Sequence, residues 1–173
     1  MTLGEALEKA LAYEKKVRDH YLQAADQVSD EKGRKALKVL AREEQGHVDY
    51  LKNCLEQWSR TGRTGGKELD RTFPPYAELE QSLQRIKKLG LEKGAACSLS
   101  EELKLLKTAL ELERETAEFY KKMASGMDRE AAQFFAPFLD IERGHQLIVQ
   151  AQMDQLSGLG YWFDFREFDL EKA

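Results

Sequence analysis

The feature that most constrains the fold of this chain is a set of four long segments in which apolar residues recur at helical spacing. The segments span about 3–28, 30–59, 100–124 and 128–156, and Pro137 is the only proline within them. Each segment carries a glutamate in the middle of its apolar face, namely Glu14, Glu44, Glu113 and Glu142. A glutamate in a protein core is costly unless it is paired or bound to a metal. Four such residues therefore indicate a polar site inside a helical protein.

The order of these segments predicts an all-α fold, because no segment shows the period-two alternation of a strand. Short links make the first two helices, and likewise the last two, antiparallel pairs. We predict a single domain over residues 1–173, a four-helix bundle with hairpins at about 3–59 and 99–157 and a long crossover at about 60–98. The crossover holds a Gly- and Pro-rich loop at 61–75, a short extra helix at 76–89 and a break at 90–98. We expect the aromatic tail at 158–173 to be a lid on the bundle or a contact with a partner chain.

Composition excludes several classes of protein. The chain has 27 basic and 31 acidic residues, a net charge of −4, which argues against a general nucleic-acid binder. No apolar run approaches the length of a membrane span, and the first residues alternate charged with apolar side chains, unlike a signal peptide. The two cysteines, Cys54 and Cys97, form no CxxC pair, which excludes a rubredoxin-type or zinc-ribbon module within these residues. We expect a cytoplasmic protein with no membrane partner.

Two of the glutamates are followed three residues later by a histidine. These pairs are Glu44 with His47 in EEQGH and Glu142 with His145 in IERGH, and the spacing puts both side chains of a pair on one helix face. With Glu14 and Glu113, the core would hold four carboxylates and two imidazoles. This set occurs in di-iron and di-manganese sites of helical bundles. Four carboxylates neutralise two divalent ions, two of them can bridge the ions, and imidazole favours iron or manganese over calcium.

An internal repeat strengthens this interpretation. Asp30 precedes Glu44 by 14 residues, as Asp128 precedes Glu142, and both aspartates are expected to cap their helices. Glu14 precedes Tyr21 by seven residues, as Glu113 precedes Tyr120. The two hairpins thus repeat after 98–99 residues. Stacking them would create a pseudo-twofold axis with a symmetric pair of ions.

The segments AYEKKVRDHY, EEQGH, ELERETAEFY and IERGH resemble the four helix signatures of the ferritin-like superfamily, and most closely those of the rubrerythrin group. The resemblance implies a ferritin-like bundle that binds two iron ions, with manganese or zinc as possible substitutes. It assigns the metal ligands to Glu14, Glu44, His47, Glu113, Glu142 and His145, with Glu44 and Glu142 as the bridging, catalytic carboxylates. It also implies that Tyr21 and Tyr120 donate hydrogen bonds to ligands.

The chain departs from the rubrerythrin pattern in two respects. Typical rubrerythrins carry a further glutamate one turn after the third-helix ligand, and here that position is Thr116. They also carry a rubredoxin domain with two CxxC pairs, which these residues lack. The first departure removes a carboxylate that the resemblance links to movement of iron when its redox state changes. The second implies that electrons come from a separate donor, such as a rubredoxin or a reductase.

Less specific interpretations apply to several of these residues. The six candidate ligands could be surface residues of an ordinary bundle, although their repetition argues against this. The two tyrosines could be ordinary core residues. Cys54 is expected to be a small buried side chain, His20 a surface residue, and Phe134, Phe135 and Phe138 core packing. Glu43, Glu111, Glu115 and Glu118 lie off the apolar face and are expected to face solvent.

The favoured function is a di-iron oxidoreductase that reduces hydrogen peroxide or dioxygen in oxidative-stress defence. Alternatives are a ferroxidase or other iron-handling protein, a structural helical module with a redox-silent metal such as zinc, and a hydroxylase or desaturase. We expect a homodimer, because the long crossover could exchange hairpins between chains.

Overall fold

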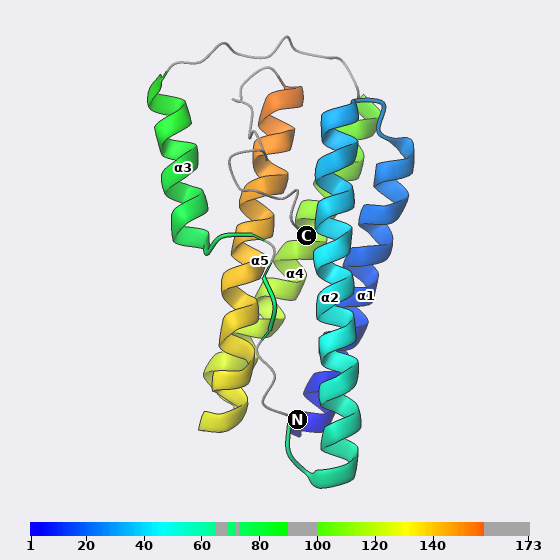
Figure 1. Ribbon diagram of the computed structural model, residues 1–173, viewed down its shortest axis with the longest axis vertical. Coiled ribbons are helices and arrows are strands. Elements are labelled where there is room, and N and C mark those ends of the chain that lie inside the picture. Colours follow the sequence, from blue (N-terminus) through cyan, green and yellow to red (C-terminus); the bar gives the residue numbers. More distant parts are fainter. Residues whose placement is uncertain (65–68, 72, 90–99, 158–173) are drawn as a thin grey trace.

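The computed structural model describes residues 1–64, 69–71, 73–89 and 100–157. It contains five helices, and the described ranges contain no strand, which confirms the predicted all-α fold (Figure 1). The helices are α1 (Leu3–Gln27), α2 (Glu31–Thr61), α3 (Tyr76–Leu89), α4 (Ser100–Gly126) and α5 (Arg129–Leu156). The expected break at 90–98, Cys97 and the aromatic tail at 158–173 lie outside the described residues.

The helices begin where the sequence supplies caps. Asp30 accepts a hydrogen bond from the backbone N–H of Gly33, and Asp128 accepts one from Ala131, so the two aspartates cap α2 and α5 as predicted. Helix α2 ends at Gly62, whose φ of 68° lies in the left-handed region that glycine adopts without strain. Helix α5 continues through Pro137.

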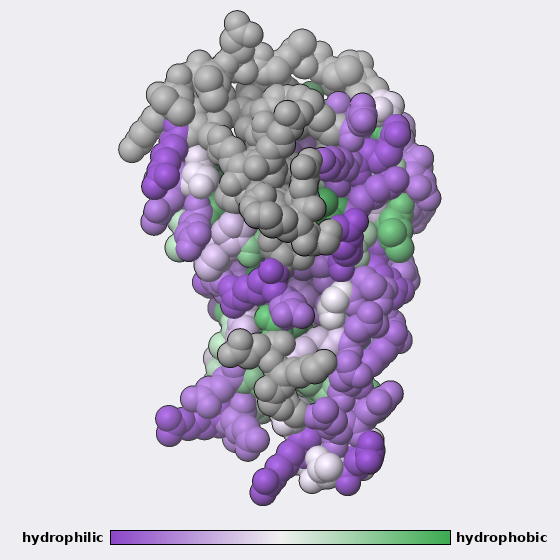
Figure 2. Space-filling model, in the orientation of Figure 1, coloured by the Kyte–Doolittle hydropathy of each residue, from purple (hydrophilic) through white to green (hydrophobic). Residues whose placement is uncertain are grey.

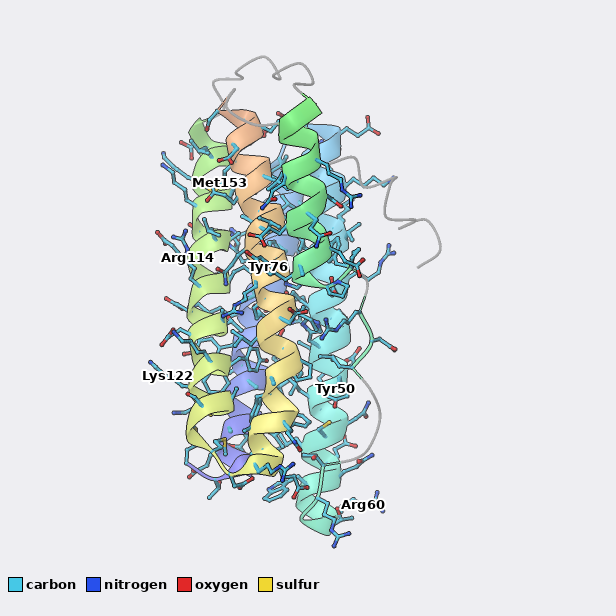
Figure 3. All side chains as sticks on the ribbon, turned by 90° about the vertical axis from the view of Figure 1, so that its left-hand side faces the viewer. Tyr50, Arg60, Tyr76, Arg114, Lys122 and Met153 are labelled. Carbon is cyan, nitrogen blue, oxygen red and sulfur yellow. The ribbon has the colours of Figure 1, made fainter. Side chains whose placement is uncertain are left out.

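The bundle consists of two stacked hairpins. Helix α1 packs along α2 and α4 along α5, while α1 also contacts α4 and joins the hairpins. Helix α3 lies outside the bundle, beside α5, as Figures 1 and 3 show from two directions. It docks at Gly144, where an added Cβ would approach Leu79 Cδ1 to 3.1 Å. Glycine at this position therefore allows the fully buried Leu79 side chain to sit against α5.

The apolar core is divided into two clusters along the bundle. One lies at the end formed by the start of α2 and the end of α5, and includes Val17, Leu37, Leu40, Leu110 and Ile148. The other lies near the start of α1 and of α5, and includes Leu7, Leu51, Cys54, Phe135 and Phe138. The residues between these clusters on each helix are the glutamates and histidines singled out above. The fold therefore places them in a layer that apolar side chains close on both sides.

The surface visible in Figure 2 is predominantly hydrophilic where residues are described. Among these residues, the large apolar side chains that stay exposed are Met1 and Leu22. None of the helices in the described part of the chain combines the length and apolar character needed to cross a membrane.

Candidate metal centre

All six candidate ligands are fully buried, and they come from the middle of four helices. Helix α1 supplies Glu14 and α4 supplies Glu113, while the Glu-x-x-His pairs come from α2 and α5. Their positions alternate with apolar residues at helical spacing, so packing the apolar faces together brings the six side chains into one layer. The alternative that they are surface residues is therefore wrong.

The six residues form two groups of four that share two members. In one group, donor atoms of Glu14, Glu44, His47 and Glu142 lie within 4.8 Å of one another. In the other, donor atoms of Glu44, Glu113, Glu142 and His145 meet the same limit. Glu44 and Glu142 belong to both groups. This is the geometry expected of two adjacent cation positions with two carboxylates between them.

Both histidines direct Nδ1 toward the carboxylates. His47 Nδ1 lies 3.0 Å from Glu14 Oε2 and 3.3 Å from Glu44 Oε2. His145 Nδ1 lies 2.7 Å from Glu44 Oε1 and 3.5 Å from Glu113 Oε1. The two rings are nearly parallel, with an interplanar angle of 16° and centroids 5.8 Å apart. Each hairpin thus contributes one imidazole nitrogen to one of the two groups.

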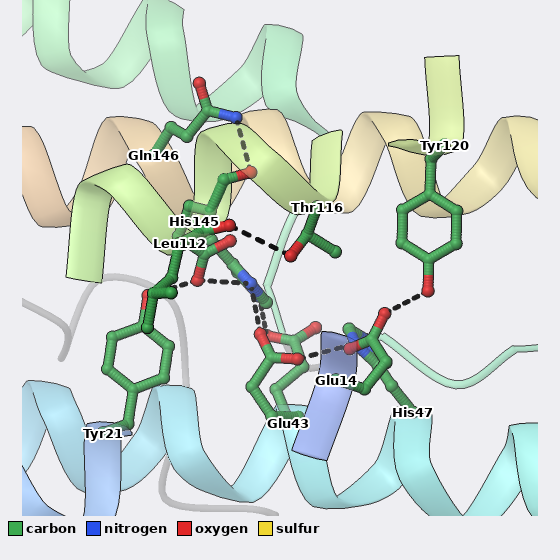
Figure 4. Close-up of polar contacts among 11 residues, drawn as sticks. Glu14, Tyr21, Glu43, His47, Leu112, Thr116, Tyr120, His145 and Gln146 are labelled. Carbon is green, nitrogen blue, oxygen red and sulfur yellow. Dashed lines mark hydrogen bonds and ion pairs between the residues drawn. The ribbon is translucent and has the colours of Figure 1, made fainter. Parts of the chain in front are cut away.

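Two tyrosines connect the hairpins across this layer. The Tyr21 hydroxyl, on α1, donates to Glu113 on α4, and the Tyr120 hydroxyl, on α4, donates to Glu14 on α1 (Figure 4). Both tyrosines are fully buried. The exchange is reciprocal because the hairpins are related by the repeat, which places each tyrosine two turns after its own helix's glutamate and opposite its partner's.

Thr116, one of the two departures from the resemblance noted in the sequence, is buried beside the cluster formed by the six candidate ligands. Its hydroxyl donates to the backbone carbonyl of Leu112, at 3.0 Å, within its own helix. Because the Thr116 hydroxyl donates its proton to this carbonyl, it is not a donor to the carboxylates of the cluster.

One sequence prediction is wrong. Glu43 was expected to face solvent, but it is 4% exposed and its Oε2 lies 3.2 Å from His145 Nε2. The side chain of Glu43 points about 100° around α2 from that of Glu44. This direction lies outside the apolar face of α2 but faces α5 in the bundle, which the helical periodicity did not indicate. Glu111, Glu115 and Glu118 are exposed as predicted. His20 is half-buried and its Nε2 lies 2.9 Å from the carbonyl oxygen of Leu105, away from the cluster.

The pKa values of the buried carboxylates are shifted in different directions. Burial, followed by the charge of Glu14, raises the pKa of Glu44 to about 8. Burial, followed by the charge of Glu113, raises the pKa of Glu142 well above its ordinary range. Burial alone would also raise the pKa of Glu14, but the charge of His47 and several hydrogen bonds outweigh it and lower that pKa to about 2. The two shared carboxylates are thus the ones that take up protons when no cation balances them.

The histidines respond in the opposite sense to burial. Burial would lower the pKa of His47, but the charges of Glu14 and Glu44 raise it to about 10. Glu113 and Glu44 likewise outweigh burial and raise the pKa of His145 well above its ordinary value. Protons on these rings compensate part of the negative charge of the cluster. The same charge would be compensated by divalent cations, whose binding must displace the protons.

A comparison with protein-family models matches the Rubrerythrin family over residues 5–153. The match covers α2 and α4 completely, nearly all of α1 and α5, and all six candidate ligands. The chain belongs to the rubrerythrin family. No curated protein and no solved structure matches it in the corresponding comparisons. Rubrerythrins are ferritin-like di-iron proteins, so the family and the geometry both direct attention to a two-metal site.

The donor atoms of this rubrerythrin-family cluster suit two iron ions. Within the described residues, neither oxygen of Glu142 accepts a hydrogen bond, and the two oxygens of Glu44 have only ion-pair contacts, Oε1 with His145 Nδ1 and Oε2 with His47 Nδ1. Glu113 Oε2 also accepts no hydrogen bond within the described residues. Buried carboxylate oxygens without partners are costly, and two divalent cations among them would remove that cost. Mixed carboxylate and imidazole donors occur in the di-iron and di-manganese sites of helical bundles.

Proposed function

We propose that this protein is a non-haem di-iron oxidoreductase that reduces hydrogen peroxide or dioxygen, with electrons from a separate donor protein. The observation that supports the proposal most is the pair of four-residue groups that share Glu44 and Glu142. Two shared carboxylates would hold a pair of ions close enough to act on one small oxidant. Mononuclear sites and structural zinc sites have no need of this sharing.

Each side chain has a definite part in the proposed site. Glu14 and His47 would bind one iron, Glu113 and His145 would bind the other, and Glu44 and Glu142 would bridge them. Four carboxylates balance the charge of two divalent ions, so the filled site would be neutral in a dry layer. When bound, the iron pair would supply two electrons together, which with two protons convert one hydrogen peroxide to two waters without releasing a radical.

The surrounding residues would keep the site rigid and dry. Tyr21 and Tyr120 hold the terminal carboxylates Glu113 and Glu14 through hydrogen bonds, which orients the oxygens that would bind iron. Burial and the adjacent carboxylates raise the pKa of both tyrosines well above the ordinary value, so both hydroxyls stay protonated as donors. The Phe135 and Phe138 side chains close the layer on one side. These groups position ligands and exclude water.

The proposal includes an external electron donor because the 173 residues contain two cysteines, too few for a four-cysteine iron centre. Of these, Cys54 is buried in the apolar cluster as expected. Under this proposal the electrons would arrive at the surface of the bundle from a donor that lies outside these residues. A rubredoxin or a flavin reductase has suitable chemistry.

The test is a single-turnover reaction of anaerobically Fe(II)-loaded protein with hydrogen peroxide or dioxygen. Optical spectroscopy follows the oxidation of iron, and electron paramagnetic resonance with a spin trap detects any hydroxyl radical. We expect one peroxide to oxidise two Fe(II) ions with no trapped hydroxyl radical, and repeated turnover when a rubredoxin and its reductase are added. Glu142→Gln should slow the reaction by at least about tenfold, whereas Glu111→Gln, on the exposed face of α4, should not. Accumulation of ferric iron well beyond two ions per chain would instead indicate an iron-handling protein, and an inert, colourless protein would indicate a structural module.

A further inference from the structure

The two imidazoles of the cluster differ in the contact made by Nε2, the ring nitrogen that faces away from the shared carboxylates. His145 Nε2 is 3.2 Å from Glu43 Oε2. By contrast, His47 Nε2 has no hydrogen-bond partner among the described residues. Both side chains are 1% exposed, and each ring meets the edge of an aromatic side chain, Phe73 for His145 and Phe138 for His47. Burial and packing are therefore alike, and the difference is the carboxylate.

The sequence encodes this difference within the repeat. Glu43 directly precedes the shared ligand Glu44, and the equivalent residue, directly before Glu142, is Ile141. Ile141 is 6% exposed, so both positions are buried, but only the α2 position carries an acid. The pseudo-twofold symmetry relates the six ligands to one another, but it does not extend to Glu43 and Ile141.

A carboxylate on Nε2 has a chemical consequence for Nδ1. A neutral imidazole carries its proton on one nitrogen and a lone pair on the other. Glu43 is placed to accept a proton held on Nε2 of His145, which leaves the lone pair on Nδ1, the nitrogen that faces Glu44 and Glu113. Such a carboxylate also increases the basicity of the imidazole, and its loss typically costs 10–100-fold in metal affinity.

We propose that Glu43 is a positioning residue that makes the two metal positions unequal. The position formed by Glu113, His145 and the shared carboxylates binds its ion more tightly and fills first. The position formed by Glu14, His47 and the shared carboxylates fills second. This inference rests on the two-metal site of the proposed function, and it adds an order of loading that the ligand symmetry does not contain.

The experiment is an anaerobic titration of the metal-free full chain with Co(II), a redox-stable probe, followed by calorimetry and visible absorption. Wild type should bind two ions in two resolved steps. In Glu43→Gln, and in Glu43→Ile, which installs the residue of the equivalent position, the first step should weaken by roughly 10–100-fold while the second changes little. Glu111→Gln is the matched control and should titrate as wild type does.

Two histidine variants test the order of filling without relying on Glu43. His47→Ala should keep the tight step and lose the weak one, whereas His145→Ala should lose the tight step. Circular dichroism of each metal-free variant shows whether the helices are intact. Two-step binding that is unchanged in both Glu43 variants, or a tight step that depends on His47, would overturn the inference and leave the proposed function standing. Fewer than two Co(II) ions in wild type would overturn the proposed function, and with it this inference.

Discussion

Replacing Tyr120 with phenylalanine removes one hydrogen bond from the centre of the bundle and little else. The ring is fully buried and packs on Phe138, with centroids 4.8 Å apart, and a phenylalanine ring would keep that contact. The lost group is the hydroxyl that donates to Glu14 Oε1. Since the pKa of Glu14 is about 2, this carboxylate is ionised at neutral pH and the bond is charge-assisted.

The size of the effect follows from the charge and burial of the acceptor. A hydrogen bond to a charged group contributes about 1.5–3 kcal/mol to the free energy of unfolding. For a chain of this size, each 1 kcal/mol shifts Tm by about 2–4 °C. We therefore expect Tyr120→Phe to lower Tm of the metal-free protein by about 3–12 °C.

The assays are thermal unfolding of chelator-treated protein, which gives Tm, and urea unfolding, which gives the free energy of unfolding, both followed by far-UV circular dichroism. Tyr76→Phe is the control, because the Tyr76 hydroxyl donates to Glu80 at 3.1 Å on the outer helix α3, and its loss should cost about 0.5 kcal/mol or less. If Tyr120→Phe and Tyr76→Phe unfold at the same urea concentration, the Tyr120 hydroxyl does not hold the Glu14 carboxylate and the reasoning fails.

Three further predictions concern charge and packing. The folded state raises the pKa of Glu44 from 4.5 to about 8 and that of His47 from 6.5 to about 10, so it binds more protons than the unfolded chain. Stability of the metal-free protein should therefore fall as the pH rises through these two intervals, measured as Tm against pH, and a rising Tm would contradict this. Loading two divalent ions at pH 7 should release about two protons or more, because the pKa values of Glu44 and His47, about 8 and about 10, both lie above 7; calorimetry in buffers of different ionisation enthalpy would count them. No release would refute the protonated cluster. Leu79→Ala should cost about 2–5 kcal/mol in urea unfolding, because the side chain is fully buried between α3 and α5; a loss below about 1 kcal/mol would show that α3 is weakly docked.

Features that depend on one helix at a time were predictable from the sequence. The capping aspartates Asp30 and Asp128, the short helix at 76–89 and the buried glutamates all follow from local rules of capping and periodicity. The repeat then indicated that the polar positions of the four helices belong together. It did so because a twofold arrangement brings equivalent positions of two hairpins to the same level.

Features that depend on how one helix is rotated against another were not predictable in the same way. Glu43 contacts His145 only because of the angle at which α2 faces α5, and a hydrophobic stripe does not define that angle. A signal was present in the broken repeat, Glu43 against Ile141, but the sequence does not reveal which imidazole the acid would reach. The crossed tyrosine bonds similarly require both hairpins in place.

The most direct test of the two-metal site is iron stoichiometry after anaerobic Fe(II) loading and removal of unbound iron. The wild type is compared with Glu142→Ala/His145→Ala and with Glu111→Ala/His20→Ala, which removes a glutamate and a histidine outside the cluster. We predict about two irons per chain in the wild type and the control, and one or none in the cluster variant. Fewer than one iron per wild-type chain, or full loading of the cluster variant, would contradict the account.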